Sequence, residues 1–189
     1  MVVSAVGLVF LAPFFLLFAL AIKTDSSGSV FYLQYRVGKG GRPFRLFKFR
    51  TMRVGADRSA PITVGQRDPR ITAVGVFLRR FKLDELPQLI NVLTGEMTLV
   101  GPRPELKKFV DLYTEEQRQV IAVTPGITDY ASIEFSNENE MLEGKSDPIE
   151  FYVREIMPKK LSLNLKYIRE QSFWLDIKII FQTIVHIMK

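Results

Sequence analysis

Two adjacent carboxylates, Asp84 and Glu85, follow a short cationic stretch and are the residues of this chain best suited to chemistry. The stretch contains Arg79, Arg80 and Lys82. A carboxylate beside fixed positive charge stays ionised at neutral pH, so it can act as a nucleophile or hold a divalent cation. The neighbouring cations can neutralise a phosphoryl group. The pattern therefore indicates chemistry on a phosphate, with one carboxylate for each of two roles.

A purely structural interpretation of Asp84 is also open. Acidic residues often begin helices because exposed N–H groups and the helix dipole favour negative charge. Apolar residues recur at the spacing of one helical face from Leu83 to Leu93, and Gly95 follows where a helix C-cap is expected. This spacing predicts a helix with Asp84 and Glu85 in its first turn. Asp84 could then serve only as a cap.

The first 22 residues contain no charged side chain, and Lys23 is the first charge. A helix of that length would extend about 33 Å, which is enough to cross a hydrocarbon core. The segment lacks the basic start and the small-residue cleavage pattern of a secretory signal, so we expect it to be retained. Pro13 removes a backbone hydrogen bond near its middle, so the helix could bend instead of crossing. A straight spanning helix that tolerates the proline is the alternative.

Composition sets the class of protein. A chain of 189 residues with 47% hydrophobic and 24% charged residues can bury one core and is not disordered. The absence of cysteine excludes a disulfide framework and a thiolate zinc site. The lone histidine, His186, lies on an apolar stretch and is assigned no role.

Charge is distributed unevenly along the chain. Residues 31–82 contain thirteen Lys or Arg against two acidic residues, whereas residues 83–158 contain fifteen acidic against six basic residues. A basic block after an apolar anchor favours anionic headgroups and predicts a cytoplasmic location. Phosphorylated ligands would suit the same surface.

Five further segments have recognisable patterns. Residues 30–37 and 43–52 predict a basic hairpin with one cationic face, joined by a glycine-rich turn, and Ile71–Phe81 predicts a helix. The prolines of 101–104 place Arg103 on a rigid extended loop. Residues 106–123 predict a polar surface helix. Residues 173–188 predict an amphipathic helix, either in a membrane interface or packed on the core.

Taken together, these residues closely resemble the bacterial sugar transferases that act on polyprenol phosphate, the small monotopic phosphoglycosyl transferases. The resemblance covers nearly the whole chain. Each landmark alone is weak, but the ordered set is highly specific. The set consists of the apolar start interrupted by Pro13, Val37-Gly38 with Phe44 to Met52, Asp68 to Thr72, Leu83 to Leu93, Gly101 to Pro104, and Pro125 to Thr128.

The resemblance implies transfer of a sugar 1-phosphate from a UDP-sugar to polyprenol (undecaprenyl) phosphate, with release of UMP. In the family the aspartate of the Asp-Glu pair attacks the phosphate that bears the sugar, so Asp84 would form a covalent aspartyl phosphosugar intermediate. Glu85, and with it Asp84, would bind Mg²⁺. The residues that the resemblance assigns to phosphate or substrate binding are Lys48, Arg50, Arg79 and Arg103.

The resemblance also implies an architecture and a location. The expected fold is an α/β monotopic membrane protein, with a re-entrant helix at residues 1–23 that is broken at Pro13. Residues 24–189 would form a compact cytoplasmic catalytic domain with a small β-hairpin and amphipathic interfacial helices. The protein would lie on the cytoplasmic face of the bacterial inner membrane and act in the first membrane step of glycan or exopolysaccharide assembly. Its partners would be membrane lipids and downstream glycosyltransferases, and no nucleic acid is expected.

Two other interpretations fit parts of the sequence. The basic, aromatic block at 31–82 would also suit a membrane-associated module that binds lipid or nucleic acid. That interpretation leaves the carboxylate pair and the loop at 101–104 unexplained. A family member that has lost turnover could instead serve as a scaffold, although the presence of both carboxylates argues against it.

Overall fold

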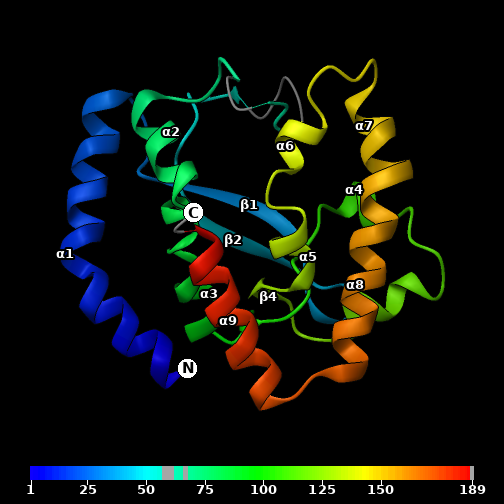
Figure 1. The fold of residues 1–189 in the computed structure, drawn as a ribbon. Coiled ribbons are helices and arrows are strands. Elements are labelled where there is room, and N and C mark those ends of the chain that lie inside the picture. The colour runs from blue at the N-terminus through cyan, green and yellow to red at the C-terminus, as the bar shows by residue number, and fades with distance from the viewer. Residues whose placement is uncertain (57–61, 66–67, 188–189) are drawn as a thin grey trace.

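The computed structural model describes residues 1–56, 62–65 and 68–187. Within them, helices alternate with two small sheets, and the long helices α1, α8 and α9 lie around the strands (Figure 1). The mixture of helix and sheet confirms the broad fold class. The strands are β1 (Phe31–Val37), β2 (Pro43–Phe49), β3 (Thr98–Val100) and β4 (Gly126–Thr128). The helical elements are α1 (Val2–Asp25), η1 (Lys39–Gly41), α2 (Ala73–Arg80), η3 (Leu83–Glu85), α3 (Gln88–Leu93), α4 (Lys107–Val110), η4 (Gln117–Ala122), α5 (Tyr130–Glu134), α6 (Glu138–Met141), α7 (Pro148–Phe151), η5 (Tyr152–Ile156), α8 (Met157–Glu170) and α9 (Phe173–Ile187).

The predicted hairpin is confirmed. β1 pairs with β2 in antiparallel register, and Gly40 and Gly41 adopt positive φ in the turn between them. The prediction of one cationic face is wrong. Lys48 follows Arg45 by three positions, so their side chains leave opposite faces of the strand. Arg45 is exposed, whereas Lys48 is directed into the protein toward Glu85.

The second sheet brings two distant loops together. β3 and β4 pair in parallel, and their backbones approach so closely that a Cβ on Gly126 would collide with the backbone of Gly101. Gly101 N donates to Thr128 O at 3.0 Å, and Gly126 N donates to Pro102 O at 3.0 Å. These bonds fix the start of the loop that contains Arg103.

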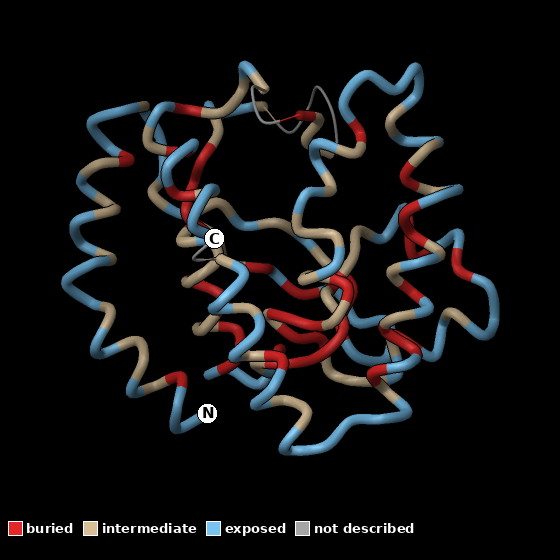
Figure 2. The backbone as a smooth tube through the Cα atoms, viewed as in Figure 1, coloured by how far each residue is buried: buried red, intermediate tan, exposed pale blue. Residues whose placement is uncertain are grey.

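Helix α1 is continuous through Pro13 and bends near its middle (Figure 1). It is long and apolar enough to cross a membrane, and it is the one such helix among the described residues. Its C-terminal half packs through Ile22 against Phe49 and Leu78. In its N-terminal half, a Cβ added to Gly7 would lie 3.6 Å from Leu89 Cδ1. Most of the helix is exposed or only partly buried (Figure 2).

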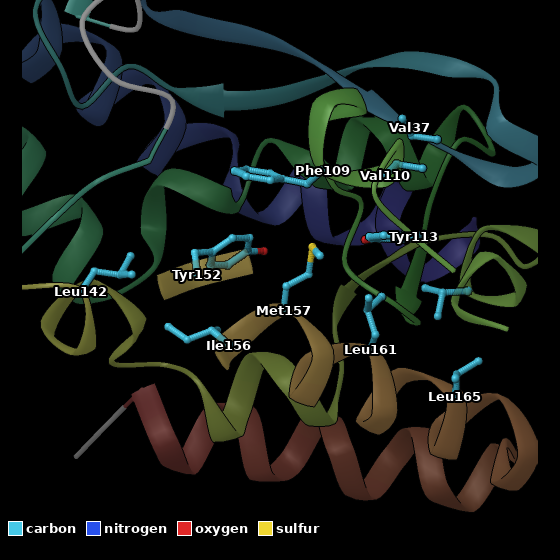
Figure 3. Packing of buried hydrophobic residues seen from close by; sticks show 11 residues of the cluster. Val37, Phe109, Val110, Tyr113, Leu142, Tyr152, Ile156, Met157, Leu161 and Leu165 are labelled. Carbon is cyan, nitrogen blue, oxygen red and sulfur yellow. The ribbon is translucent and has the colours of Figure 1, made fainter. Parts of the chain in front are cut away.

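The largest apolar cluster lies between the end of β1, α4 and the continuous helix formed by α7, η5 and α8 (Figure 3). It corrects the prediction of a single surface helix over residues 106–123. That segment contains the four-residue α4 and the 3₁₀ turn η4, and it buries Phe109, Val110, Tyr113 and Val120. These four positions would share one face of a continuous helix, but the segment instead breaks into α4 and η4, so tertiary contacts outweigh local helix propensity.

The amphipathic helix predicted near the C-terminus is confirmed as α9. Ile179 is fully buried against Val100 and Tyr167, so one face packs on the core. The other face exposes large apolar side chains, including Trp174, which is 78% exposed, and Phe181. Helix α9 therefore has apolar side chains on both faces, and only one of these faces is covered by protein.

The close approach of β3 and β4 yields a stability prediction. Gly126→Ala should lower the free energy of unfolding by about 1–3 kcal/mol, because the added methyl has only backbone atoms to displace. The control is Gly7→Ala, whose Cβ would make ordinary contact with Leu89 and which gains helix propensity. Denaturant unfolding of both variants in detergent measures the difference. Equal stability of the two variants would contradict the packing described for β4.

Candidate active site

The carboxylate pair lies in a tight turn between two helices. α2 ends at Arg80, Lys82 takes a left-handed backbone conformation, and η3 carries Asp84 and Glu85 before α3 begins. The predicted single helix from Leu83 is therefore interrupted. Pro87 has no N–H to donate, so the hydrogen bonding of α3 starts only beyond it. The turn removes both carboxylates from the regular helix and directs them toward β2.

Glu85 is bound by two cations from different parts of the chain. Lys48 Nζ donates to its Oε1 at 3.1 Å, Arg103 Nη1 donates to its Oε2 at 2.9 Å, and Arg103 Nη2 also donates to Oε1. The side chains of all three residues are less than a third exposed. A bidentate arginine–carboxylate pair fixes orientation as well as charge.

The pKa shifts in this cluster follow from the pairing. Burial raises the pKa of Glu85, but Arg103 and Lys48 outweigh it and bring that pKa well below its usual range. Burial also lowers the pKa of Lys48, with partial compensation from Glu85. The pKa of Arg103 is raised, because the attraction of Glu85 and its hydrogen bonds exceed the cost of burial. Glu85 is therefore ionised at neutral pH.

Asp84 has the opposite environment. Its side chain belongs to a residue that is 6% exposed, and its Oδ1 is buried without a hydrogen bond. Burial, followed by repulsion from Glu85, raises the pKa of Asp84 against the opposing charges of Lys48, Arg79 and Lys82. This corrects the expectation that adjacent cations keep its pKa low. The capping interpretation also fails, because Asp84 accepts no hydrogen bond from the start of α3.

The predicted phosphate-binding arginines separate into different places. Arg103 joins the dyad, and its backbone N–H donates to Asp129 Oδ2 at 3.1 Å. Arg79 Nε donates to Thr51 Oγ1 at 2.8 Å and its Nη1 to Thr63 Oγ1 at 3.2 Å. Its pKa is lowered by burial, which Asp84, Asp68 and Glu85 partly offset.

Arg50 is not brought to the carboxylate pair. Its guanidinium donates to Ser26 O at 2.7 Å, to Ser27 O at 2.5 Å and to Ile22 O at 3.5 Å. These are carbonyl groups at the C-terminal end of α1, where a cation is favourable. Arg50 thus anchors the apolar helix to the hairpin.

Sequence reasoning missed the residues that support the loop of Arg103. Glu105 accepts hydrogen bonds from Arg36 Nη1 at 2.9 Å and from Tyr152 Oη at 2.5 Å, and Asp129 accepts from the backbone of Ser132 at 2.6 Å. Burial raises the pKa of Glu105, but Arg36 and other partners lower it overall. No local signal marks the role of Glu105, because Arg36 and Tyr152 are far away in the sequence. Asp129 caps the start of α5 through Ser132, but its contact with Arg103 N spans 26 residues and has no local signal either.

The carboxylate oxygens of Asp84 and Glu85 decide how well magnesium would fit this site. Within residues 1–56, 62–65 and 68–187, no three His, Asp or Glu side chains form a cluster that could hold a metal ion. Magnesium, however, is often held by one or two carboxylates together with substrate phosphates and water. The unpaired Oδ1 of Asp84 suits that arrangement. Glu85 suits it less well, since both of its oxygens are bound by Arg103 and Lys48.

Comparison with known proteins places the chain in a family. The model of the family described as bacterial sugar transferase matches residues 1–189. The chain belongs to this family. The names of curated relatives specify undecaprenyl phosphate.

Three of these relatives illustrate the match. The chain is 41% identical over 190 residues to the UDP-glucose:undecaprenyl-phosphate glucose-1-phosphate transferase of Escherichia coli (strain K12), covering 97% of this chain and 38% of that protein. It is 43% identical over 188 residues to the undecaprenyl-phosphate glucose phosphotransferase of Komagataeibacter xylinus, covering 96% and 33%. It is 35% identical over 188 residues to an Aeromonas hydrophila UDP-N-acetylgalactosamine-undecaprenyl-phosphate N-acetylgalactosaminephosphotransferase, covering 96% and 40%. The chain thus spans 33–40% of the length of these curated relatives.

The raised pKa of Asp84 predicts a site that lowers fold stability. A group whose pKa is higher in the folded than in the unfolded state stabilises the fold below its unfolded pKa, and that contribution is lost as the pH rises through the folded pKa. Asp84→Asn should therefore be more stable than the wild type, by a margin that grows from about pH 4 upward and then levels off. Thermal unfolding in detergent across that pH range measures it.

Asp129→Asn is the matched control. Asp129 is fully buried and accepts backbone N–H groups with both oxygens, so one new amide would face Arg103 N. This variant should lose about 1–3 kcal/mol of stability. If Asp84→Asn were destabilised to the same extent, the carboxylate of Asp84 would be held by stabilising contacts and its unpaired state would be refuted.

Proposed function

We propose that this protein transfers a sugar 1-phosphate from a UDP-sugar to undecaprenyl phosphate and releases UMP. The observation that carries the proposal is the contrast between the two carboxylates. Glu85 is bound by two cations, while Asp84 lies beside them with its Oδ1 buried and without a hydrogen bond to any described residue. An unpaired carboxylate among cations is suited to attack a phosphate. The names of the relatives support the donor and acceptor classes.

In the first step, a carboxylate oxygen of Asp84 attacks the phosphorus that bears the sugar. A new oxygen–phosphorus bond forms, the bond from that phosphorus to the oxygen bridging the two phosphates breaks, and UMP leaves. The product is a covalent aspartyl phosphosugar. The raised pKa of Asp84 reflects a carboxylate that is poorly stabilised as an anion, which favours its consumption in the attack.

In the second step, an oxygen of the lipid phosphate attacks the same phosphorus. The bond to Asp84 breaks, the carboxylate is restored, and polyprenol diphosphate sugar is formed. Dividing the reaction in this way means that the soluble donor and the lipid acceptor never need to occupy the site together. Two bulky anions therefore do not have to be neutralised at once.

Glu85 positions the cations that receive phosphate. It holds Lys48 and Arg103 at fixed places beside Asp84, so their positive charge requires no rearrangement when the substrate binds. Arg79, which contacts two threonines, contributes further positive charge on the side of α2. We assign phosphate binding to Lys48, Arg79 and Arg103, and a structural role to Arg50.

Asp84 would hold Mg²⁺ through a carboxylate oxygen, with the other ligands supplied by donor phosphates and water. When bound, the ion supplies positive charge to the diphosphate oxygens as the bridging bond breaks. The sequence suggested Glu85 as a ligand. Its hydrogen bonds to Arg103 and Lys48 favour a role in charge positioning instead.

We also propose that residues 1–23 form a re-entrant membrane helix and that residues 24–189 form the catalytic domain on the cytoplasmic face of the bacterial inner membrane. Both halves of α1 contact the catalytic domain, at Leu89 and at Leu78, which is compatible with ends on one face of the membrane. Exposed apolar residues on α2, at its C-cap and on α9 would rest in the interface. They include Val76, Phe77, Phe81, Trp174 and Phe181.

Nucleotide release tests the reaction. Detergent-purified protein with Mg²⁺, undecaprenyl phosphate and a panel of UDP-sugars should release UMP with at least one donor, and EDTA should abolish the release. Asp84→Asn should reduce the rate by a factor on the order of 10⁴ or more, because no nucleophile replaces the carboxylate. Release of UDP in place of UMP, or normal turnover in the variant, would refute the mechanism.

Thiol labelling tests the topology. The chain contains no cysteine, so Val3→Cys and Ser29→Cys introduce unique labels at exposed positions near the two ends of α1. A membrane-impermeant maleimide should label both positions in inverted membrane vesicles and neither in intact cells with a permeabilised outer membrane. Labelling of position 3 from the periplasmic side would establish a spanning helix.

A further inference from the structure

The cations around the carboxylate pair differ in whether they already have a partner. Lys48 and Arg103 are bound to Glu85, and Arg79 donates to two threonine hydroxyl groups. Lys82 is exposed, and its side chain makes no hydrogen bond or ion pair with any residue in the part of the chain that the structure describes. Lys82 is therefore available to a ligand without breaking an existing contact.

The backbone at Lys82 is unusual. With φ of 53° and ψ of 20°, it is the one non-glycine residue with positive φ within the described ranges. This conformation is disfavoured for L-residues, and glycine is the residue that adopts it without a steric penalty. The chain uses glycine at its other described positions of positive φ, namely Gly28, Gly40, Gly41, Gly55, Gly65, Gly95 and Gly144. Fold stability alone does not account for a lysine here.

The strained residue forms the joint between α2 and the turn that carries the nucleophile. Lys82 N donates to Arg79 O at 3.1 Å, and Lys82 O accepts from Glu85 N at 3.2 Å. Its side chain thus starts two residues before Asp84, on a backbone whose direction is fixed at both ends. Its charge is close enough to oppose the raised pKa of Asp84 and to contribute to the lowered pKa of Glu85.

Charge balance gives this position a purpose. Lys48 and Arg103 together carry two positive charges, and Asp84 and Glu85 carry two negative charges when both are ionised. These four groups balance one another, so the positive charge left for an incoming diphosphate comes from cations outside this set, namely the partly buried Arg79 and the exposed Lys82. Lys82, as an exposed ammonium group, supplies such charge where solvent and substrate have access.

We propose that Lys82 is a substrate-binding residue whose ammonium group binds the diphosphate of the donor beside Asp84. The proposal rests on the proposed function and identifies a residue that the dyad and its paired cations do not include. The left-handed conformation is disfavoured for a lysine, and such strain is common at functional sites, which fits a residue retained for its charge. A phosphate on the lipid acceptor has the same chemistry, so the two substrates must be distinguished by experiment.

Three substitutions separate the charge from the backbone. Lys82→Gly and Lys82→Asn both tolerate positive φ and remove the charge, whereas Lys82→Arg keeps the charge. The control is Lys39→Asn, which removes one exposed lysine from the hairpin turn at η1. Thermal unfolding should show that all four variants remain folded, with midpoints within a few degrees of the wild type.

Binding of UDP, measured by calorimetry in the presence of Mg²⁺, is the first readout and needs no turnover. Lys82→Gly and Lys82→Asn should bind UDP about 10- to 100-fold more weakly than the wild type, as expected for loss of a charge-assisted hydrogen bond. Lys82→Arg and Lys39→Asn should stay within about threefold of it. Unchanged UDP affinity in both uncharged variants would overturn the proposal.

The second readout assigns the substrate. UMP released from the UDP-sugar in the absence of lipid reports the first step alone, and it should require about 10- to 100-fold more donor in Lys82→Asn. A normal donor requirement, combined with a raised requirement for undecaprenyl phosphate, would overturn the assignment to the donor. If the wild type binds UDP but releases no UMP, the proposed transfer fails while the binding comparison still decides the role of Lys82.

Discussion

The pairing of Glu85 with Lys48 and Arg103 is the interaction on which the site depends. Glu85 lies in the turn after α2, Lys48 in the second strand of the hairpin and Arg103 in the loop after β3. Lys48 and Arg103 are 37 and 18 residues from Glu85 along the chain. Each of these segments is separately fixed, the hairpin by its core contacts and the loop by the close approach of Gly101 and Gly126. Removing the Glu85 carboxylate would leave two cations facing each other with little solvent, which is costly. The arrangement of charge therefore depends on the fold as a whole.

This pairing also gives the two neighbouring carboxylates different environments, on which the nucleophilic role proposed for Asp84 rests. Glu85 takes up the hydrogen bonds that Lys48 and Arg103 could offer, and Asp84 remains buried with Oδ1 unpaired. Adjacent residues of the same chemical type thus have pKa values shifted in opposite directions. A carboxylate that accepted strong hydrogen bonds would be more stable and a weaker nucleophile. The interactions that hold Lys48 and Arg103 in place stabilise the fold, whereas burial of the Asp84 carboxylate lowers its stability. Such a loss of stability is common at functional sites.

Local patterns in the sequence were sufficient for part of this description. The hairpin, α2, α9 and the carboxylate pair follow from periodicity, turn residues and charge, all of which act within a few residues. The prediction of one helix over residues 106–123 is wrong because tertiary burial, which local spacing does not report, decides the conformation of this segment. Arg50 resembled a phosphate ligand in sequence, but its partners are carbonyl groups near the end of α1. The cations near Asp84 in sequence do not keep its pKa low, because burial and the neighbouring Glu85 raise that pKa more than Lys48, Arg79 and Lys82 lower it.

The contacts at the end of α1 connect the apolar helix to the segment that leads to Asp84 and Glu85. Arg50 binds carbonyl groups of Ser26 and Ser27, and Asp25 Oδ2 accepts from Val74 N at the start of α2 at 2.8 Å. Because α2 leads directly into the turn of Asp84, the depth at which the helix enters a membrane would set the height of the proposed nucleophile above it. A lipid-linked phosphate has a fixed height at the headgroup level, whereas a soluble donor can approach from any depth in the aqueous phase. This connection would therefore serve the proposed lipid acceptor more than the donor, in keeping with the proposed division of the reaction into two steps.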